Sequence, residues 1–291
     1  MELNNKIINI FLTGGGYKGA FQSGFLFKLG EWLETHQKYQ IGKVYGSSIG
    51  AINGSIFLNN RQHLRDFWNS IKSYKSMMSF WCNIPIIGKL ISIIYGFFFK
   101  CCLINPAKFY NLIRTYCSHN NNNKLVICAT NLTQNKIDFV NFTSAQRGCS
   151  NIIDYIIASS SLWMYSPPIK INNNMYADGG ILKYLPINDD IINDVKEEIN
   201  VIISCAKKPD LNDTSYEKTN LLFYLDKIIH MMCDLTYEND MKNIQKLKNF
   251  RCYIINQKLL ENISMLTFDE NNIRSLWDDG IVQAQNFIEA L

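Results

Sequence analysis

Hydrophobic and polar positions along the 291-residue chain predict short buried strands that alternate with helices. Residues 6–13 are typical of a buried strand, because the run is short, rich in β-branched side chains and followed by glycines. The next segment, residues 17–35, carries large apolar side chains at helical spacing. These are Phe21, Phe25, Leu29, Trp32 and Leu33.

The same alternation continues toward the C-terminus. A short strand at 43–45 precedes a helix at 51–58, and residues 124–142 read as two strands joined by a polar turn at Gln134–Asn135. Further buried strands are predicted at 198–206 and 250–257. Strands separated by helices predict an α/β fold with a central, mostly parallel sheet.

Residues 77–104 are unusually apolar, but they do not have the pattern of a membrane-spanning helix. Lys89 and Lys100 bracket a largely apolar stretch of only ten residues, and Pro85 and Gly88 interrupt the segment further. A spanning helix needs about 20 apolar residues. We therefore expect this segment to lie on a membrane, to form a lid, or to cover the sheet as a buried helix.

Composition and charge exclude several classes of protein. With 47% hydrophobic residues, 19% charged residues and a net charge of +4, the chain is globular and too weakly basic to indicate nucleic-acid binding. The nine cysteines include no CxxC pair, so we expect reduced thiols in an intracellular protein and no metal site. The first ten residues lack the basic start and long apolar core of a signal peptide, which favours a cytoplasmic location.

A glycine-rich loop, "FLTGGGYKGAFQSG" at 11–24, follows the first strand. Gly14, Gly16 and Gly19 satisfy GxGxxG, so the loop could bind a dinucleotide pyrophosphate, or it could stabilise an anion that forms only during a reaction. A dinucleotide site needs an acidic residue at the end of the second strand, but Glu34 lies late in the predicted helix instead. A P-loop would need GKS or GKT after the glycines. Both absences favour the transient anion.

The second glycine motif is "GSSIG" at 46–50, which fits GxSxG with Ser48 at its centre. A predicted strand precedes it and a predicted helix follows it, as in a nucleophile elbow. Side chains at Gly46 and Gly50 would collide with neighbouring backbone at such a turn. The alternative is a tight turn that contains a serine by coincidence.

An activated serine needs a base, and two candidates occur. Asp178 precedes Gly179 and Gly180 in "NMYADGGILKYLPI", although Asp-Gly alone can be a simple turn. His230 completes the Ser–Asp–His order of α/β-hydrolases, but it lies in the apolar, helix-like run "LLFYLDKIIHMMCDL". A histidine in such a run is more often part of a helix face, which favours Asp178.

Three segments together resemble the signatures of the patatin-like phospholipase family, in the order of that family. They are "LTGGGYKGAFQSGFL", "YGSSIGAINGSI" and "ADGGILKYLPI". The strand pair at 124–142 and the segment "TFDENNIRSLWDDGIVQAQNF" are similar to further parts of the family. The resemblance covers nearly the whole chain and is weakest over 60–123 and 207–248.

The resemblance implies one patatin-like domain spanning 1–291, a three-layer sandwich with helices on both faces of a central, mostly parallel sheet. It implies a serine acyl hydrolase that cleaves phospholipids or lysophospholipids through an acyl-enzyme. The alternative is a lipid-binding or partner-activated effector with the same fold and little turnover of its own.

The resemblance also assigns roles to individual residues. Ser48 would be the nucleophile and Asp178 the base of a dyad without histidine, with Gly46 and Gly50 shaping the elbow and Gly179 and Gly180 following the aspartate. The oxyanion hole would be formed by the loop, with the amides of Gly15 and Gly16 foremost. Its members are Gly14, Gly15, Gly16, Lys18 and Gly19. Lys18 would act electrostatically, unless it is only a solvated lysine.

No cofactor or metal is implied. The expected partners are a phospholipid or lysophospholipid, a membrane surface contacted peripherally through residues 77–104, and an activating protein of unknown identity. The expected location is the cytoplasm, at the surface of membranes.

Overall fold

The computed structural model describes residues 5–77, 105–118, 122–148, 151–163, 165–206, 221–260 and 268–291. Between 221 and 230, only Ile228 has a described side chain. The predicted lid or membrane-contact segment, 77–104, lies outside the described residues apart from Met77.

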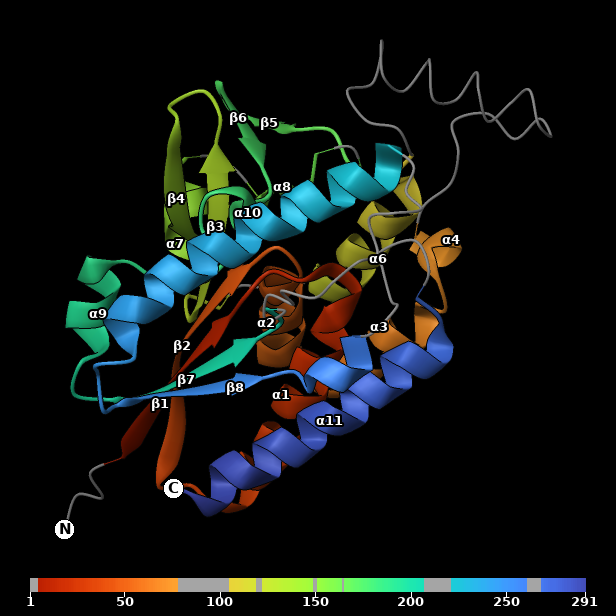
Figure 1. Ribbon diagram of the computed structural model, residues 1–291. Coiled ribbons are helices and arrows are strands. Elements are labelled where there is room, and N and C mark those ends of the chain that lie inside the picture. Colours follow the sequence, from red (N-terminus) through yellow and green to blue (C-terminus); the bar gives the residue numbers. More distant parts are fainter. Residues whose placement is uncertain are drawn as a thin grey trace.

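Within the described residues, eight strands form one mixed sheet whose centre is parallel (Figure 1). The strands are β1 (Lys6–Leu12), β2 (Tyr39–Ser47), β3 (Leu125–Asn131), β4 (Lys136–Asn141), β5 (Ile169–Ile171), β6 (Asn174–Ala177), β7 (Ile199–Ser204) and β8 (Phe250–Ile254). Their order is β5-β6-β3-β2-β1-β7-β8, and β4 pairs with β3. From β3 to β8 along this order all neighbours are parallel, whereas β4, β5 and β6 pair antiparallel.

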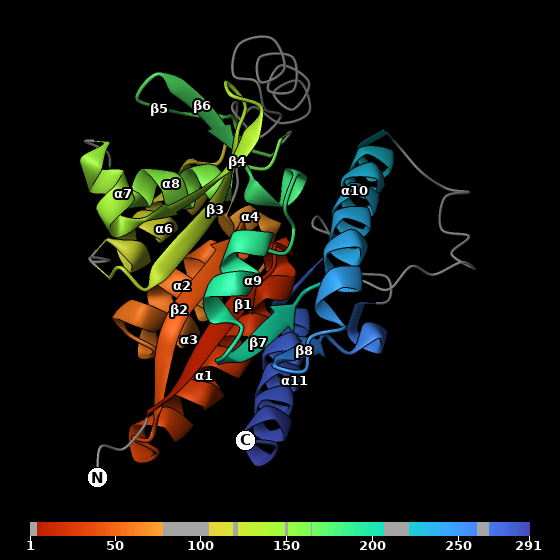
Figure 2. The same cartoon turned by 90° about the vertical axis from the view of Figure 1, so that its left-hand side faces the viewer.

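Helices cover both faces of this sheet (Figure 2). One face carries α1 (Gly19–Thr35), α2 (Ile49–Asn59), α3 (Gln62–Ser70), α6 (Ala107–Cys117), α8 (Ile152–Ser159) and α11 (Glu270–Glu289). The other face carries α9 (Asp189–Val195) and α10 (Leu221–Ile244). Shorter helices complete the chain: η1 (Gly16–Lys18), α4 (Tyr74–Met77), α7 (Phe142–Arg147), η3 (Gly179–Ile181) and η5 (Gln257–Leu260). Among the described residues, no helix is both long enough and apolar enough to cross a bilayer.

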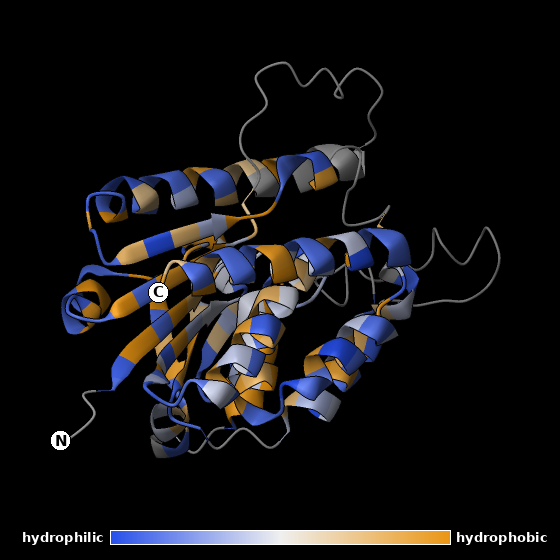
Figure 3. Cartoon of the chain, turned by 90° about the horizontal axis from the view of Figure 1, so that it is seen from below, coloured by the Kyte–Doolittle hydropathy of each residue, from blue (hydrophilic) through white to orange (hydrophobic). Residues whose placement is uncertain are grey.

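Side-chain alternation along the strands produces the two cores between these layers. Ile8, Ile10 and Leu12 of β1 are fully buried under the larger helical layer. Phe11 points to the opposite face, where its ring stacks on Tyr45 of β2 with centroids 4.7 Å apart. Figure 3 shows hydrophobic colouring concentrated on the central strands, whereas the outer helices carry both colours.

The predicted α/β three-layer architecture is confirmed, with two differences in detail. Strand β2 begins at Tyr39, earlier than the predicted 43–45. Its first half contains Gln40 and Gly42, which weaken the apolar pattern, but it still pairs with β1. Strand β5 was not predicted, since three residues, Ile169–Ile171, are too few to give a periodic signal.

Helices α1 and α11 approach so closely that glycine is required where they meet. A Cβ atom on Gly24 would lie 2.0 Å from the carbonyl oxygen of Trp277, and one on Gly280 would lie 2.0 Å from that of Phe21. Gly30, in the same helix as Gly24, differs, because its Cβ would meet side chains and no backbone: Arg61 Cδ at 2.6 Å and Phe57 Cε2 at 3.1 Å.

Gly24→Ala is therefore expected to lower the free energy of unfolding by about 3 kcal/mol, because the new methyl group must push two backbones apart. Gly30→Ala is the matched control and should change it by less than about 1 kcal/mol, since better helix propensity offsets the displacement of Arg61. Urea denaturation followed by circular dichroism measures both. Equal losses in the two variants would contradict the close-approach argument.

Candidate active site

Ser48 occupies the sharp turn between β2 and α2. Its backbone has φ 55° and ψ −126°, a conformation that L-residues rarely adopt. Gly50 lies in the first turn of α2 and makes the turn possible, because a Cβ there would be 2.4 Å from the carbonyl oxygen of Leu12. Gly46 lies in β2 beneath the same turn. The strained turn leaves Ser48 partly exposed at the end of its strand, the geometry of a nucleophile elbow.

The backbone amide of Ser48 is held by Ser159, a fully buried residue at the end of α8. The amide donates to Ser159 Oγ at 3.0 Å, and that hydroxyl donates in turn to the carbonyl oxygen of Cys128 in β3 at 2.6 Å. A buried amide without a partner would be costly, so this relay stabilises the strained turn.

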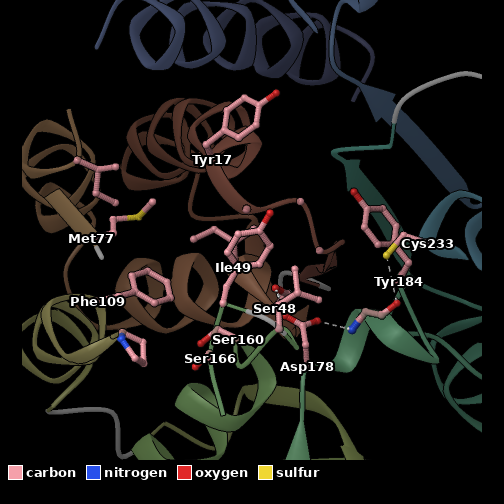
Figure 4. A pocket seen from close by; sticks show the side chains of 18 of the residues that line it. Tyr17, Ser48, Ile49, Met77, Phe109, Ser160, Ser166, Asp178, Tyr184 and Cys233 are labelled. Carbon is pink, nitrogen blue, oxygen red and sulfur yellow. Dashed lines mark hydrogen bonds between the residues drawn. The ribbon is translucent and has the colours of Figure 1, made fainter. Parts of the chain in front are cut away.

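Asp178 lies directly opposite Ser48, at the end of β6 (Figure 4). Ser48 Oγ donates to Asp178 Oδ2 at 2.6 Å. The other carboxylate oxygen, Oδ1, accepts from the amide of Gly180 at 2.7 Å, while Gly179 begins η3. Thr130 Oγ1 in β3 also donates to the carbonyl oxygen of Asp178 at 2.7 Å. The orientation of the carboxylate is thus fixed on both sides.

Burial changes the acidity of this carboxyl group. Asp178 is only 3% exposed, and its desolvation raises its pKa to about 7, although hydrogen bonds from Ser48 and Gly180 oppose the rise. At neutral pH the group is consequently close to half protonated, which suits a side chain that accepts and returns a proton.

The glycine loop lies beside the serine. A Cβ on Gly14 would be 3.4 Å from Ser48 Cβ, and the Gly14 amide donates to the carbonyl oxygen of Tyr184 at 3.2 Å. Within the described ranges, the amides of Gly15 and Gly16 make no hydrogen bond to another protein group. Both residues are partly exposed and line the same pocket as Ser48. Two donors are thus available next to the serine.

The last two residues predicted for the oxyanion loop, Lys18 and Gly19, do not line the pocket. Lys18 is 4% exposed, so it is not a solvated lysine, and it is not among the residues that line the pocket. Burial raises the pKa of the Cys205 and Cys233 thiols to about 12, and the nearby ammonium of Lys18 opposes this rise. Gly19 begins α1, and its carbonyl oxygen accepts from Asn53 Nδ2 at 2.9 Å.

A largely apolar pocket adjoins Ser48 and Asp178. Its empty volume is about 960 Å³, which includes space open to solvent. Figure 4 shows Met77 and Phe109 on one side of the serine and Tyr184 and Cys233 on the other. The apolar wall is formed by Trp68, Ile71, Met77, Phe109 and Leu162. This arrangement can hold a hydrocarbon chain next to the serine hydroxyl.

The competing candidates are placed elsewhere. Glu34, which a dinucleotide site would need at the end of β2, lies near the end of α1 and pairs with Arg61 at 3.2 Å. His230 belongs to α10, and its side chain lies outside the described residues. In the described part of the chain, no group of three His, Cys, Asp or Glu side chains could hold a metal ion.

Comparison with known proteins agrees with this geometry. Residues 10–191, more than half of the chain, match the model of the family described as patatin-like phospholipase. The chain belongs to the patatin-like phospholipase family. The resemblance of the three motifs is thereby confirmed, because all of them lie inside the matched region.

Curated relatives of this patatin-like chain are much longer proteins. Lysophospholipase NTE1 from Meyerozyma guilliermondii and from Candida albicans are each 26% identical over 192 residues. That match covers 64% of this chain but only 12% of either relative. Among solved structures, VipD from Legionella pneumophila matches with a TM-score of 0.44 and 13% identity, covering 99% of this chain and 67% of that chain.

The patatin-like motifs did not reveal every residue at the site. The sequence does not predict that Ser159 and Cys233 lie at the site, or that Tyr184 contacts the glycine loop. Ser159 belongs to the run "ASSS", whose serines at the end of an apolar helix are a weak sign of buried polar contacts. Cys233 contacts the site because its thiol donates to the carbonyl oxygen of Gly180 at 3.5 Å. Such a tertiary contact leaves no local pattern.

The buried carboxyl group makes a prediction about stability. The folded pKa of Asp178 lies above its ordinary value of 3.8, so its favourable contribution is fully present below about pH 4 and is lost as the pH rises through about 7. Asp178→Asn removes this titration. The variant should therefore be more stable than wild type above pH 7, by about 2–4 kcal/mol, with the gain shrinking toward pH 4. Urea unfolding across this pH range measures the difference; a gain that does not depend on pH would contradict the argument.

Proposed function

We propose that the chain is a serine acyl hydrolase that cleaves fatty-acyl esters of phospholipids or lysophospholipids. The observation that carries the proposal is the 2.6 Å hydrogen bond from Ser48 Oγ to Asp178 Oδ2 beside the unbonded amides of Gly15 and Gly16. A hydroxyl, a base and two donors in one pocket are the groups that acyl transfer requires.

In the acylation step, Ser48 Oγ attacks the ester carbonyl carbon while its proton passes to the Asp178 carboxylate. The carbonyl oxygen becomes an oxyanion, and the amides of Gly15 and Gly16 donate hydrogen bonds to it. When the tetrahedral intermediate collapses, the ester C–O bond breaks and the leaving alkoxide takes the proton from Asp178. The products are a free alcohol and acyl-Ser48.

Deacylation repeats these steps with water as the nucleophile. Asp178 accepts a proton from the water as its oxygen attacks the acyl carbon, and the same two amides hold the new oxyanion. Collapse breaks the bond to Ser48 Oγ, which regains a proton from Asp178. A fatty acid leaves, and the starting hydrogen bond between Ser48 and Asp178 forms again.

Two observations support a lipid ester as the substrate. The apolar wall of the pocket, which includes Trp68, Phe109 and Leu162, suits an acyl chain and offers few hydrogen-bond partners to a polar substrate. The curated relatives are lysophospholipases, and the family is that of patatin-like phospholipases. Both point to the ester of a long-chain fatty acid.

An activity-based probe tests the nucleophile. A fluorophosphonate should label the wild-type chain, and Ser48→Ala should abolish the labelling because, among the described residues, no other hydroxyl donates to the Asp178 carboxylate. On a soluble short-chain ester, Ser48→Ala and Asp178→Asn should each lower kcat/KM by about a thousandfold or more. His230→Ala is the control and should change it by less than about twofold. Labelling of Ser48→Ala, or a large loss in His230→Ala, would refute the dyad.

The pH dependence tests the base separately. Asp178 must be deprotonated to accept the proton of Ser48, and its pKa is raised to about 7. The value of kcat/KM should therefore increase about tenfold per pH unit below pH 7 and become constant above it. Initial rates on the same soluble ester, measured over the range in which the fold is intact, give the profile. An increase centred near the ordinary pKa of an aspartate would show that the buried carboxyl group is not the base.

A further inference from the structure

Exposed apolar side chains are concentrated at the edge of the sheet that carries the site. Among the described residues, ten large hydrophobic side chains are exposed, and only Ile7 and Val282 lie away from that edge. Leu132 follows the end of β3 directly, and its amide donates to the carbonyl oxygen of Met175. The other members of this rim are Trp163, Leu182, Ile228, Met231, Met232 and Leu235.

Helix α10 contributes the largest part of the rim, because it has two apolar faces. Its inward face packs against the sheet through Cys233, Tyr237, Met241 and Ile244. The opposite face carries four residues spaced i, i+3, i+4 and i+7, each 47–59% exposed. They are Ile228, Met231, Met232 and Leu235. Farther along, the same outward face carries the exposed polar residues Asn239, Lys242 and Asn243. The outward face is thus apolar only in the half nearest the site.

The rim and the pocket are continuous along the chain. Met232 precedes Cys233, which lines the pocket, and Trp163 follows Leu162, which also lines it. Leu182 lies between two lining residues, Gly180 and Tyr184. Three separate elements therefore expose an apolar side chain next to the residues around Ser48, so the rim borders the pocket instead of forming an isolated patch.

Positive charge accompanies this rim. Lys170 pairs in register with Met175 across β5 and β6, and Lys108 precedes Phe109, a residue of the pocket wall. Both lysines are exposed, and the ion pairs of the described residues include neither, although Lys108 Nζ donates to the carbonyl oxygen of Lys75 at 3.4 Å. Apolar side chains flanked by lysines, with a tryptophan among them, are typical of surfaces that contact lipid head groups and the acyl boundary.

We propose that this rim is the face by which the chain docks on an anionic lipid bilayer, with the outward face of α10 inserted into the head-group region and the pocket opening onto it. The inference rests on the proposed function, since a chain that cleaves the acyl esters of lipids must reach its substrate at a lipid surface. A protein partner is the less favoured occupant, because the rim spans several elements around the pocket and has lysines without acidic partners.

The test compares vesicle binding with soluble catalysis. Binding is measured by co-sedimentation with phosphatidylcholine vesicles, with and without phosphatidylserine, in the Ser48→Ala background so that the lipid is not consumed. Met231→Ser/Leu235→Ser should weaken partitioning by about tenfold or more. Val282→Ser is the matched control, because Val282 is 57% exposed on α11, away from the rim. Its partitioning should be unchanged.

Charge is tested in the same assay. Lys108→Gln/Lys170→Gln should weaken binding to the phosphatidylserine vesicles by about tenfold and leave binding to neutral vesicles nearly unchanged. The Met231→Ser/Leu235→Ser chain with Ser48 restored should hydrolyse the soluble short-chain ester at the wild-type rate, which shows that the site is intact.

Several results would overturn the docking surface. One is vesicle binding of Met231→Ser/Leu235→Ser that is as strong as that of the parent chain. Another is a loss of vesicle binding in Val282→Ser as large as that in the double variant. A third is a chain that does not bind vesicles but self-associates through α10. Failure of the proposed function looks different. In that case the chain with Ser48 would not hydrolyse the soluble ester, while the loss of vesicle binding in Met231→Ser/Leu235→Ser would still support docking.

Discussion

The hydrogen bond between Ser48 and Asp178 joins two residues that are 130 positions apart, and strand β3 determines whether it can form. On one side, the Cys128 carbonyl oxygen holds Ser159, which holds the amide of Ser48. On the other side, Thr130 Oγ1 holds the carbonyl oxygen of Asp178. Ser48 and Asp178 are therefore both positioned by the same strand, one through a backbone carbonyl group and the other through a side-chain hydroxyl. A rigid element of this kind can keep a donor and an acceptor aligned without reorganisation during a reaction.

Burial has opposite consequences for stability and for chemistry at this site. Removing the Asp178 carboxylate from water destabilises the folded chain at neutral pH, but the same desolvation raises its pKa to a value useful for proton transfer. Helix α10 contributes to this burial. Its Cys233 thiol donates to the Gly180 carbonyl oxygen, and Lys183, close to η3, forms an ion pair with Asp240 of α10. The helix thus stabilises the turn that presents the carboxylate.

The parts of the site that the sequence predicted are those with strict local geometry. A turn with the backbone angles of Ser48 requires small neighbours such as Gly46 and Gly50, so it leaves a recognisable pattern between a strand and a helix. Lys18 shows where prediction from local sequence fails, because its burial depends on elements far along the chain. Of its two interpretations, that of a solvated lysine was wrong. Segment 77–104 stays a prediction, since it lies outside the described residues apart from Met77.

The apolar run at 221–235 illustrates why periodicity alone could not predict which sides of α10 are covered by the rest of the chain. Residues 221–235 are apolar on most sides, a pattern that fits a helix buried in a core. The structure covers the side of Cys233 and Tyr237, whereas Met231 and Leu235 remain exposed. Sequence reports how much apolar surface a helix carries but not which neighbour covers each side. Exposing the second side to water costs free energy, and the adjoining pocket is itself apolar, so the proposed docking on a lipid surface accounts for both features.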